Sequence, residues 1–136
     1  MHLGRDDLEK YQKYKSALSS LLLEEPQKES YIRAIAYSHT KSKATPDNTS
    51  GSKLEKIAIH EIEKEEEREE SIRHLRAKII LIERFIYSIE DPITKGIFIS
   101  RVFQNLRWRE VADNFHMSKS ACWEIYDNYL KSAKIE

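Results

Sequence analysis

Histidines beside a run of glutamates are the residues best suited to binding a metal. His60-Glu61-Ile62-Glu63-Lys64 begins like the helical zinc motif with a histidine at each end. Its fifth position is Lys64, so the second ligand is absent. The remaining histidines are not spaced as a ligand set: His2, His39, His74 and His116. We therefore expect no metal site.

The nucleophiles and carboxylates also lack an enzymatic pattern. Cys122, the only cysteine, is expected on the inner face of a helix, where its thiol has no evident histidine partner. The glutamates of 61–70 follow one another in a charged run, whereas acid–base catalysis needs carboxylates in an apolar setting. We expect a protein that is not an enzyme and that uses no cofactor.

The segment Leu106–Leu130 is more informative, because it has the order of a helix-turn-helix. A short helix is predicted over about 108–115, followed by a tight turn at His116-Met117-Ser118. Ser118 is a favourable N-cap for the next helix, which ends near Lys131. The side chains expected to face the core recur at helical spacing: Val111, Ala112, Phe115, Met117, Cys122, Ile125 and Leu130.

Side chains suited to DNA lie on the other face of this second helix. Lys119, Ser120 and Trp123 occupy positions from which a recognition helix reaches base edges in the major groove. Lys119, beside the helix N-terminus, also suits a phosphate. Contacts with the DNA backbone are expected from basic residues before and after the turn: Arg101, Arg107, Arg109, Lys131 and Lys134. For Trp108 and Trp123 the alternative is packing in the core or between subunits.

The stretch Glu110–Ile125 is similar, without a gap, to the helix-turn-helix of sigma-factor region four, which reads a promoter element. The wider layout resembles the RinA- and ArpU-type late transcription regulators of phages and prophages of Gram-positive bacteria. The matching residues lie near the C-terminus: Trp108, Val111, Ala112, Met117, Ser118 and Ile125. The recognition helix departs from the region-four pattern, because Lys119 is the only basic residue in its first turns. Guanine reading by an arginine of this helix is therefore not predicted.

The resemblance implies a transcription regulator that binds double-stranded DNA and activates late or packaging genes in the cytoplasm of a bacterial host. It leaves contact with RNA polymerase open. A homo-oligomer is expected, with a dimer favoured, because a pair of such units reads two half-sites. Two other functions remain open: a phage small terminase subunit, which packages DNA, and a protein-interaction module whose helix-turn-helix no longer binds DNA.

The helices before this segment must position it. A first helix is expected to start at Asp6 or Asp7, with Asp6 and Glu9 as a capping box, and to end before Pro26. A second is expected over 27–38. Residues 39–52 are small and polar, which favours a mobile linker, with an ordered ligand loop as the alternative.

A long charged helix is predicted over 53–90. Its apolar residues form a heptad seam: Ile72, Leu75, Ile79, Ile82, Ile86 and Ile89. Leu54, Ala58 and Ile62 extend an apolar stripe at its front. The uninterrupted charged run over 63–70 is expected to project into solvent. This helix is expected to serve oligomerisation or contact with a partner.

Asp91-Pro92 is expected to end that helix and to cap a new one over about 92–104. Its buried face is predicted to hold Ile93, Ile97, Phe98, Val102 and Phe103. The predicted organisation is therefore all-α: an N-terminal helical segment (1–38), a polar loop (39–52), the long helix (53–90) and a helix-turn-helix unit (91–136).

Composition agrees with this organisation. Three Gly and three Pro in 136 residues disfavour turn-rich β folds and glycine-rich phosphate loops. The chain has neither an apolar run long enough to span a membrane nor the layout of a signal peptide. Lys+Arg and Asp+Glu each number 23, so the formal net charge is zero. Residues 101–119 hold more basic than acidic residues, so we expect few phosphate contacts per subunit.

Overall fold

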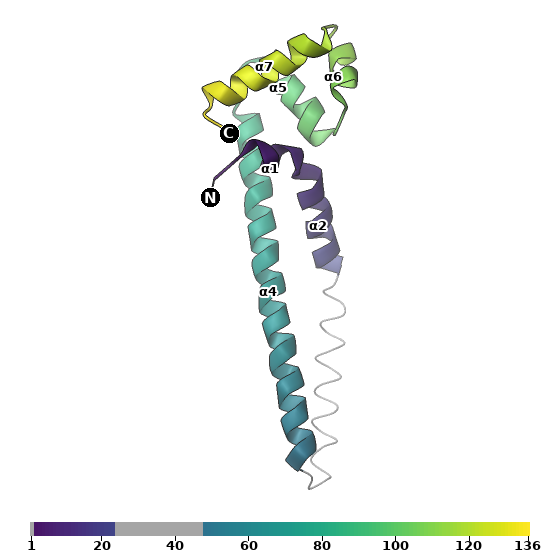
Figure 1. The fold of residues 1–136 in the computed structure, drawn as a ribbon, viewed down its shortest axis with the longest axis vertical. Coiled ribbons are helices and arrows are strands. Elements are labelled where there is room, and N and C mark those ends of the chain that lie inside the picture. Colours follow the sequence, from purple (N-terminus) through teal and green to yellow (C-terminus); the bar gives the residue numbers. More distant parts are fainter. Residues whose placement is uncertain (1, 24–47) are drawn as a thin grey trace. The chain divides into compact units, whose positions relative to one another are not determined.

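The structure is a computed structural model that describes residues 2–23 and 48–136, with side chains described from residue 55 onward in the second range. Every regular element in these ranges is a helix (Figure 1), which confirms the predicted all-α fold class. The helix expected over 27–38 and most of the loop expected over 39–52 lie outside the described residues. In the ranges that are described, no helix has the length and apolar composition needed to cross a membrane.

The N-terminal region forms two helices, α1 (Arg5–Glu9) and α2 (Tyr11–Leu23), where one continuous helix was predicted. The predicted capping box of Asp6 and Glu9 is wrong. Gly4 is the N-cap, and its N–H donates to the Asp7 carboxylate at 2.9 Å. The backbone leaves helical geometry at Lys10.

The long helix α4 runs over Asn48–Tyr87, so it begins and ends before the predicted 53–90. The predicted seam is confirmed: Ile72, Ile79, Ile82, Ile86 and Ile89 are buried, and Leu75 is half-buried. The stripe expected at the front is not covered at Ile62, which is 58% exposed.

The C-terminal region contains α5 (Pro92–Phe98), a π-helical turn (Ile99–Phe103), α6 (Trp108–Asn114) and α7 (Lys119–Ser132). Asp91 caps α5 as predicted, because its carboxylate accepts from the Thr94 N–H at 2.9 Å. This hydrogen bond from the Thr94 backbone lowers the pKa of Asp91. Ile97, Phe98 and Val102 are buried, but Ile93 is 47% exposed. Its predicted burial is wrong, because the first turn of α5 turns this side chain outward.

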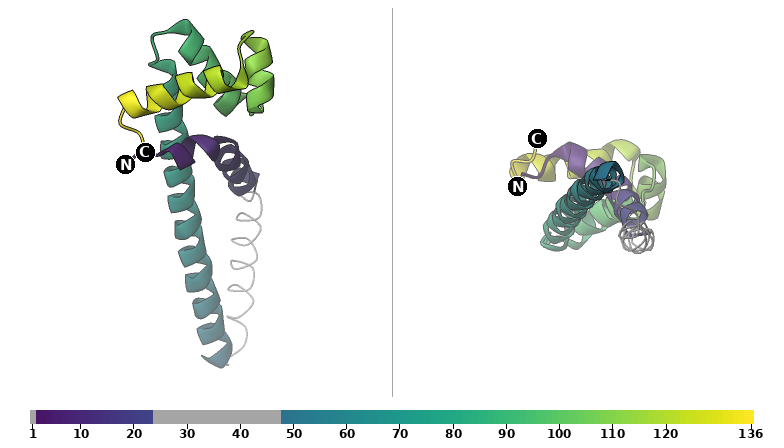
Figure 2. Two further views of the ribbon diagram at one scale, coloured as in Figure 1. Left: turned by 45° about the horizontal axis from the view of Figure 1, so that its top comes forward. Right: turned by 90° about the horizontal axis from the view of Figure 1, so that it is seen from below.

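The described chain divides into two compact units, and the first joins Met1–Ala17 with Leu75–Glu136. Its core is built from fully buried side chains of several helices: Leu8, Ile82, Ile86, Ile97, Phe98, Val111, Cys122 and Leu130. Figure 2 shows α7 crossing the C-terminal end of α4, where the Tyr129 and Phe85 ring centroids lie 5.8 Å apart. The N-terminal helix α1 thus contributes to the same core as the C-terminal helices.

The second unit lies within Leu18–His74 and contains the charged run of α4. Most of this run is exposed, as expected, but Glu65 and Arg68 are half-buried. Arg68 donates to the Leu21 carbonyl at 2.7 Å and forms an ion pair with Glu65 at 2.9 Å. The expectation that the whole run projects into solvent is therefore wrong at these two positions, because Arg68 binds both Glu65 and the backbone of α2.

Candidate nucleic-acid interface

A tight turn joins α6 to α7 and fixes the start of α7. Phe115 is the C-cap of α6, and His116 directly after it lies in the left-handed backbone region, with a φ of 54°. The Met117 N–H donates to the Ala112 carbonyl at 3.0 Å, and the His116 N–H donates to the Asp113 carbonyl at 3.3 Å. These are the two hydrogen bonds of a Schellman motif, which satisfies the last carbonyls of a helix. The predicted turn at His116-Met117-Ser118 is confirmed.

Ser118 begins α7 as predicted. Its hydroxyl accepts from the Ala121 N–H at 3.1 Å, which satisfies one of the free N–H groups of the first turn. Ser118 and the first two residues of α7, Lys119 and Ser120, are exposed. The turn and the cap together set the direction in which α7 leaves α6.

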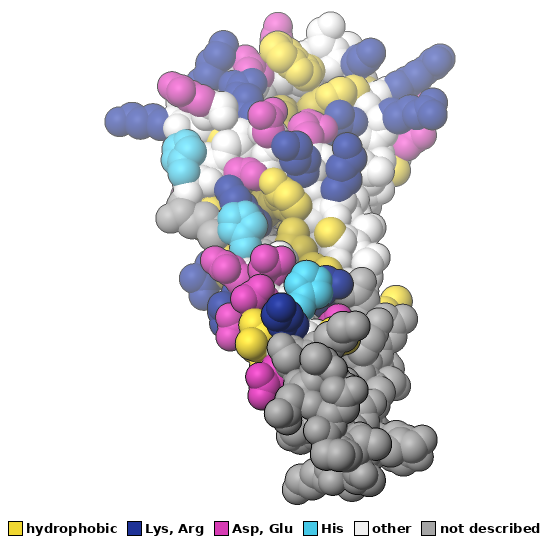
Figure 3. Space-filling model, turned by 60° about the horizontal axis from the view of Figure 1, so that its bottom comes forward, with side chains coloured by type: hydrophobic (Ala, Val, Ile, Leu, Met, Phe, Trp, Pro, Cys, Tyr) yellow, Lys and Arg dark blue, Asp and Glu magenta, His cyan; other side chains and the backbone are white. Residues whose placement is uncertain are grey.

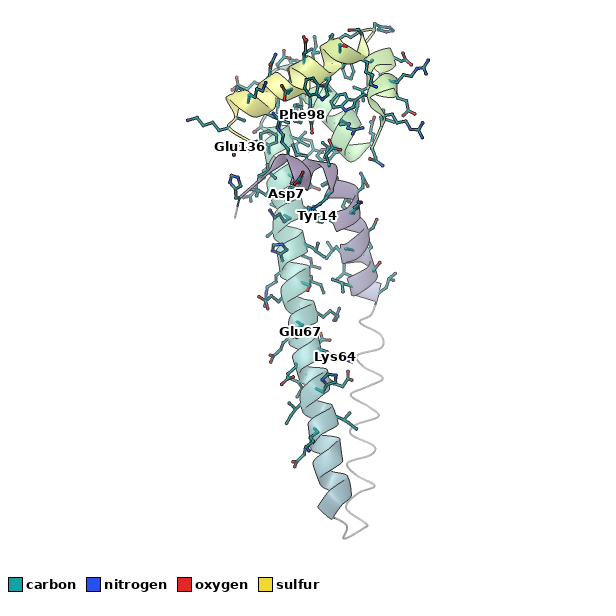
Figure 4. The ribbon with its side chains drawn as sticks, viewed as in Figure 1. Asp7, Tyr14, Lys64, Glu67, Phe98 and Glu136 are labelled. Carbon is teal, nitrogen blue, oxygen red and sulfur yellow. The ribbon has the colours of Figure 1, made fainter. Side chains whose placement is uncertain are left out.

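The inner face of α7 is held by aromatic packing. Tyr126 is buried and stacks on Phe98 with ring centroids 4.5 Å apart. Trp108 of α6 meets the edge of the same ring at 4.9 Å. Figure 4 shows Phe98 beneath α7. Burial raises the pKa of Tyr126 and of the Cys122 thiol, so both side chains stay uncharged at neutral pH.

Close packing between α5 and α6 also supports this arrangement. Gly96 lies against Phe115, and a Cβ added at Gly96 would come within 2.7 Å of the Phe115 ring. The absence of a side chain at Gly96 therefore lets the phenyl ring sit against α5. Phe115 and Met117 are half-buried, while Val111 and Ala112 are buried as predicted.

The far end of α7 is tied to the N-terminal segment through Asp127. This buried carboxylate forms ion pairs with Lys131 at 3.0 Å and with Arg5 at 2.7 Å. Both contacts lower the pKa of Asp127. The Arg5 N–H also donates to the Glu136 carbonyl at 2.9 Å. As a result, α7 is anchored at both ends.

The outer face of α7 exposes the residues that the sequence predicted for base contact. Lys119 and Ser120 are exposed, and Trp123 is 47% exposed. They lie in the first turns of the helix, opposite buried Cys122 and Tyr126. For Trp123, packing in the core of this chain is therefore ruled out.

The two tryptophans thus differ. Trp108 is half-buried, and its indole lies between Tyr126 and the Arg101 guanidinium, whose central carbon is 5.0 Å from the ring centroid. Of the expected kinds of packing, the structure shows packing of Trp108 at the edge of this chain's own core. Trp108 supports α7 and does not present its ring to solvent as Trp123 does.

The predicted basic residues fall into two groups. Arg107 and Arg109, at the start of α6, are exposed, and among the described residues neither has an ion-pair partner. Arg101 is half-buried and donates to the Leu106 carbonyl at 3.0 Å and to Glu9 at 3.1 Å. Lys131 is exposed but paired with Asp127, and Lys134 is exposed. Lys119, Arg107 and Arg109 are therefore the cations best placed for an anionic ligand.

Two further exposed residues on α7 were missed by the sequence reasoning. Glu124 and Asn128 follow Ser120 at four-residue intervals, which places all three on one side of the helix. The four-residue spacing from Ser120 is visible in the sequence and could have identified Glu124 and Asn128. An asparagine amide can pair with adenine, and a glutamate can accept from cytosine, so both belong to a face that could read bases.

Comparisons with models of protein families, with curated proteins and with solved structures give no significant match to this chain. Within the residues that the structure describes, His, Cys, Asp and Glu side chains do not gather in threes or more as metal ligands would. The arrangement is a rigid helix with exposed polar, aromatic and basic groups at its N-terminal end. Such a surface can bind a partner that offers both negative charge and flat, hydrogen-bonding edges.

Proposed function

We propose that this protein binds double-stranded DNA by inserting the N-terminal half of α7 into the major groove. One observation carries the proposal: α7 exposes Lys119, Ser120 and Trp123 together, while its other face is packed into the core. A recognition helix needs this combination, because its contact residues must be held rigidly and yet be accessible.

Each exposed residue has a distinct part in this interface. Lys119 contacts a phosphate beside the N-terminus of α7, and Arg107 and Arg109 contact the backbone from α6. Ser120 and Asn128 hydrogen-bond to base edges, and Trp123 packs on a sugar or a thymine methyl group. Arg101 and Lys131 act indirectly, because their partners Trp108, Glu9 and Asp127 already hold them.

We further propose that DNA binding serves transcription regulation, as in the RinA- and ArpU-type late regulators that the sequence resembles. In that role the protein activates late or packaging genes of a phage or prophage and works in the cytoplasm of the host. The small number of free cations at the interface gives one subunit weak affinity. A second subunit, or RNA polymerase, would then supply the remaining binding energy.

Salt-dependent DNA binding tests the proposal. Fluorescence anisotropy on labelled duplexes from the gene's own surroundings would give the slope of log affinity against log salt. Lys119→Ala and Arg109→Ala should each weaken binding and reduce the slope by about 0.9, the value for one neutralised phosphate. Lys13→Ala, which removes an exposed lysine of α2, is the matched control and should leave both quantities unchanged.

A second function is favoured by Glu124. This acidic residue lies on the exposed side of α7, where it opposes a phosphate backbone. The competing proposal is therefore a protein-interaction module that uses the same face. Absence of DNA affinity at low salt on every duplex tried, with the protein fully folded, would reject DNA binding and favour this module.

A further inference from the structure

Two exposed stripes on α4 have complementary character. The acidic stripe consists of Glu55, Ile59, Ile62 and Glu66, which follow one another at intervals of three or four residues. The basic stripe consists of Arg76, Ile80, Arg84 and Tyr87, at the same kind of interval. Because such intervals keep side chains on one face of a helix, each set forms a continuous strip. The acidic stripe belongs to the second compact unit and the basic stripe to the first.

Large apolar side chains lie exposed within both stripes. Ile59 is 56% and Ile62 58% exposed in the acidic stripe; Ile80 is 47% and Tyr87 59% exposed in the basic stripe. Figure 3 shows acidic and apolar side chains gathered on the exposed surface of α4. Apolar groups ringed by charge are typical of a protein-binding surface, since single exposed apolar residues are common but ordered strips are not.

The charges in the stripes are free to pair with a partner. Glu55, Glu66, Arg76 and Arg84 are exposed and form no ion pair with any described residue. By contrast, Lys78 and Arg68 on other sides of α4 are paired with Asp7 and Glu65. Charges without an ion-pair partner among the described residues thus lie beside exposed apolar residues in both stripes.

We propose that a second copy of this chain covers these stripes, with the acidic stripe of one copy docked antiparallel on the basic stripe of its partner. This proposal specifies which surface forms the expected dimer and that the two α4 helices run antiparallel. It does not depend on DNA binding. Ile62 packs on Ile80 of the partner subunit, and Glu66 pairs with Arg76 of the partner subunit. Glu55 then lies beside Tyr87 and Arg84 of the partner subunit.

The spacing supports this register. The interval from Ile62 to Glu66 equals that from Arg76 to Ile80, and the interval from Glu55 to Ile62 equals that from Ile80 to Tyr87. Each stripe is about 17 Å long, from eleven residue-to-residue steps at the helical rise of about 1.5 Å. When the helices run antiparallel in this register, the apolar pair of Ile62 and the partner's Ile80 therefore lies one helical turn from the opposite-charge pair of Glu66 and the partner's Arg76.

Charge selects the antiparallel direction. A parallel pair in register would place acidic stripe against acidic stripe and basic against basic, and like charges at close range are unfavourable. An antiparallel pair is symmetric, so the acidic-to-basic contact forms twice in one dimer. Two identical contacts give a closed dimer without further subunits.

Charge reversal in the full-length protein tests the inference. Sedimentation equilibrium in the absence of DNA should show a dimer of about 32 kDa, since one chain has a mass of 16.1 kDa and 2 × 16.1 = 32.2. Glu66→Arg alone and Arg76→Glu alone should each raise the dimer Kd by about tenfold, because each creates like-charge contacts. The double variant Glu66→Arg with Arg76→Glu should return to near the wild-type Kd, since the pairing is restored with its signs exchanged.

Glu67→Arg is the matched control. Glu67, labelled in Figure 4, is exposed, and as the next residue after Glu66 it lies outside the three- and four-residue spacing of the stripe, so the Kd should not change. Mixing Ile62→Cys protein with Ile80→Cys protein under oxidation should give a mixed disulfide dimer, whereas Cys122 is buried and should not react. A monomer at all concentrations, or a dimer that both single reversals leave intact, would overturn the inference. Lys119→Ala should lose DNA binding but keep the mass of the dimer. Dimer formation and the proposed DNA binding can therefore fail independently of each other.

Discussion

At the scale of single residues, charged groups that form ion pairs hold the fold together, whereas charged groups without a partner can bind a ligand. Asp7 is held by the Gly4 N–H, by Lys78 at 2.9 Å and by the Tyr14 hydroxyl at 2.7 Å. Figure 4 shows Asp7 and Tyr14 close together. Arg5 and Asp127 likewise bind each other. The pairs Lys78–Asp7 and Arg5–Asp127 join elements that are distant in sequence. By contrast, Lys119, Arg107 and Arg109 remain available to a ligand.

The carboxylate of Asp7 makes folding stability depend on pH. Burial alone would raise its pKa, but hydrogen bonds from Gly4, Lys78 and Tyr14 outweigh burial and lower the pKa from 3.8 to about 2. Its stabilisation is therefore fully present above pH 3.8 and is lost as the pH falls toward about 2. Asp7→Asn should lower the free energy of unfolding by about 2 kcal/mol at neutral pH, measured by urea unfolding.

The difference between Asp7→Asn and wild type should shrink steadily between pH 4 and pH 2, since the wild-type carboxylate becomes neutral there. Asp6→Asn is the control, because Asp6 is exposed and should change stability little at any pH. If Asp7→Asn lowers the free energy of unfolding by the same amount at pH 2 and at pH 7, the stabilisation does not come from the charge of Asp7.

At the scale of elements, apolar spacing decided which face of each helix is buried. The heptad positions Ile72, Ile79, Ile82 and Ile86 of α4 are buried, and α7 buries Cys122, Tyr126 and Leu130. Helix ends were predicted well where a capping side chain is unambiguous, as at Asp91 and Ser118. They were predicted less well at the N-terminus, where Asp6 and Asp7 are adjacent and the backbone of Gly4 selects Asp7.

Two isoleucines show how much burial determines stability. Ile82 on α4 is fully buried, whereas Ile93 on α5 is 47% exposed. Ile82→Ala should cost about 2–5 kcal/mol of unfolding free energy, because it leaves a cavity in the core. Ile93→Ala, the same substitution outside the core, should cost less than about 1 kcal/mol. Equal losses for the two variants, measured by thermal or urea unfolding, would show that the core is assigned incorrectly.

At the scale of the molecule, the C-terminal helices share their core with the N-terminus. Leu8 and Tyr11 are buried with residues of 75–136, and Tyr11 donates to Glu83 at 2.7 Å. Gln12 donates to the Phe103 carbonyl at 2.6 Å. The predicted helix-turn-helix segment 91–136 therefore forms part of a larger compact unit with α1 and the end of α4.

This sharing predicts how a fragment behaves. A peptide of residues 91–136 lacks Phe85, whose ring packs on Phe98 of α5 and Tyr129 of α7, and it lacks the buried Leu8, Ile82 and Ile86 of the same compact unit. We expect weak helicity and no cooperative unfolding, followed by circular dichroism on heating. The full-length chain is the control. A fragment that melts cooperatively at the full-length temperature would contradict the shared core.

The sequence alone predicted most of what depends on neighbouring residues. Helical spacing and capping residues predicted an all-α chain, the buried seam of α4, and the short helix, turn and longer helix near the C-terminus, because these patterns act within a few turns. The same spacing placed Lys119, Ser120 and Trp123 on the exposed face of α7. The domain division and the function remain predictions.

The tertiary structure decided what depends on contacts between distant residues. It showed that Arg101 is held by Glu9 and Trp108, that Arg68 binds the backbone of α2, and that α1 packs with the C-terminal helices. A cation on a helix surface has the same local sequence whether it is free or paired, since its partner lies many residues away. Only the packing of α1, α4 and α7 distinguishes the arginines that hold the fold from those that can meet a ligand.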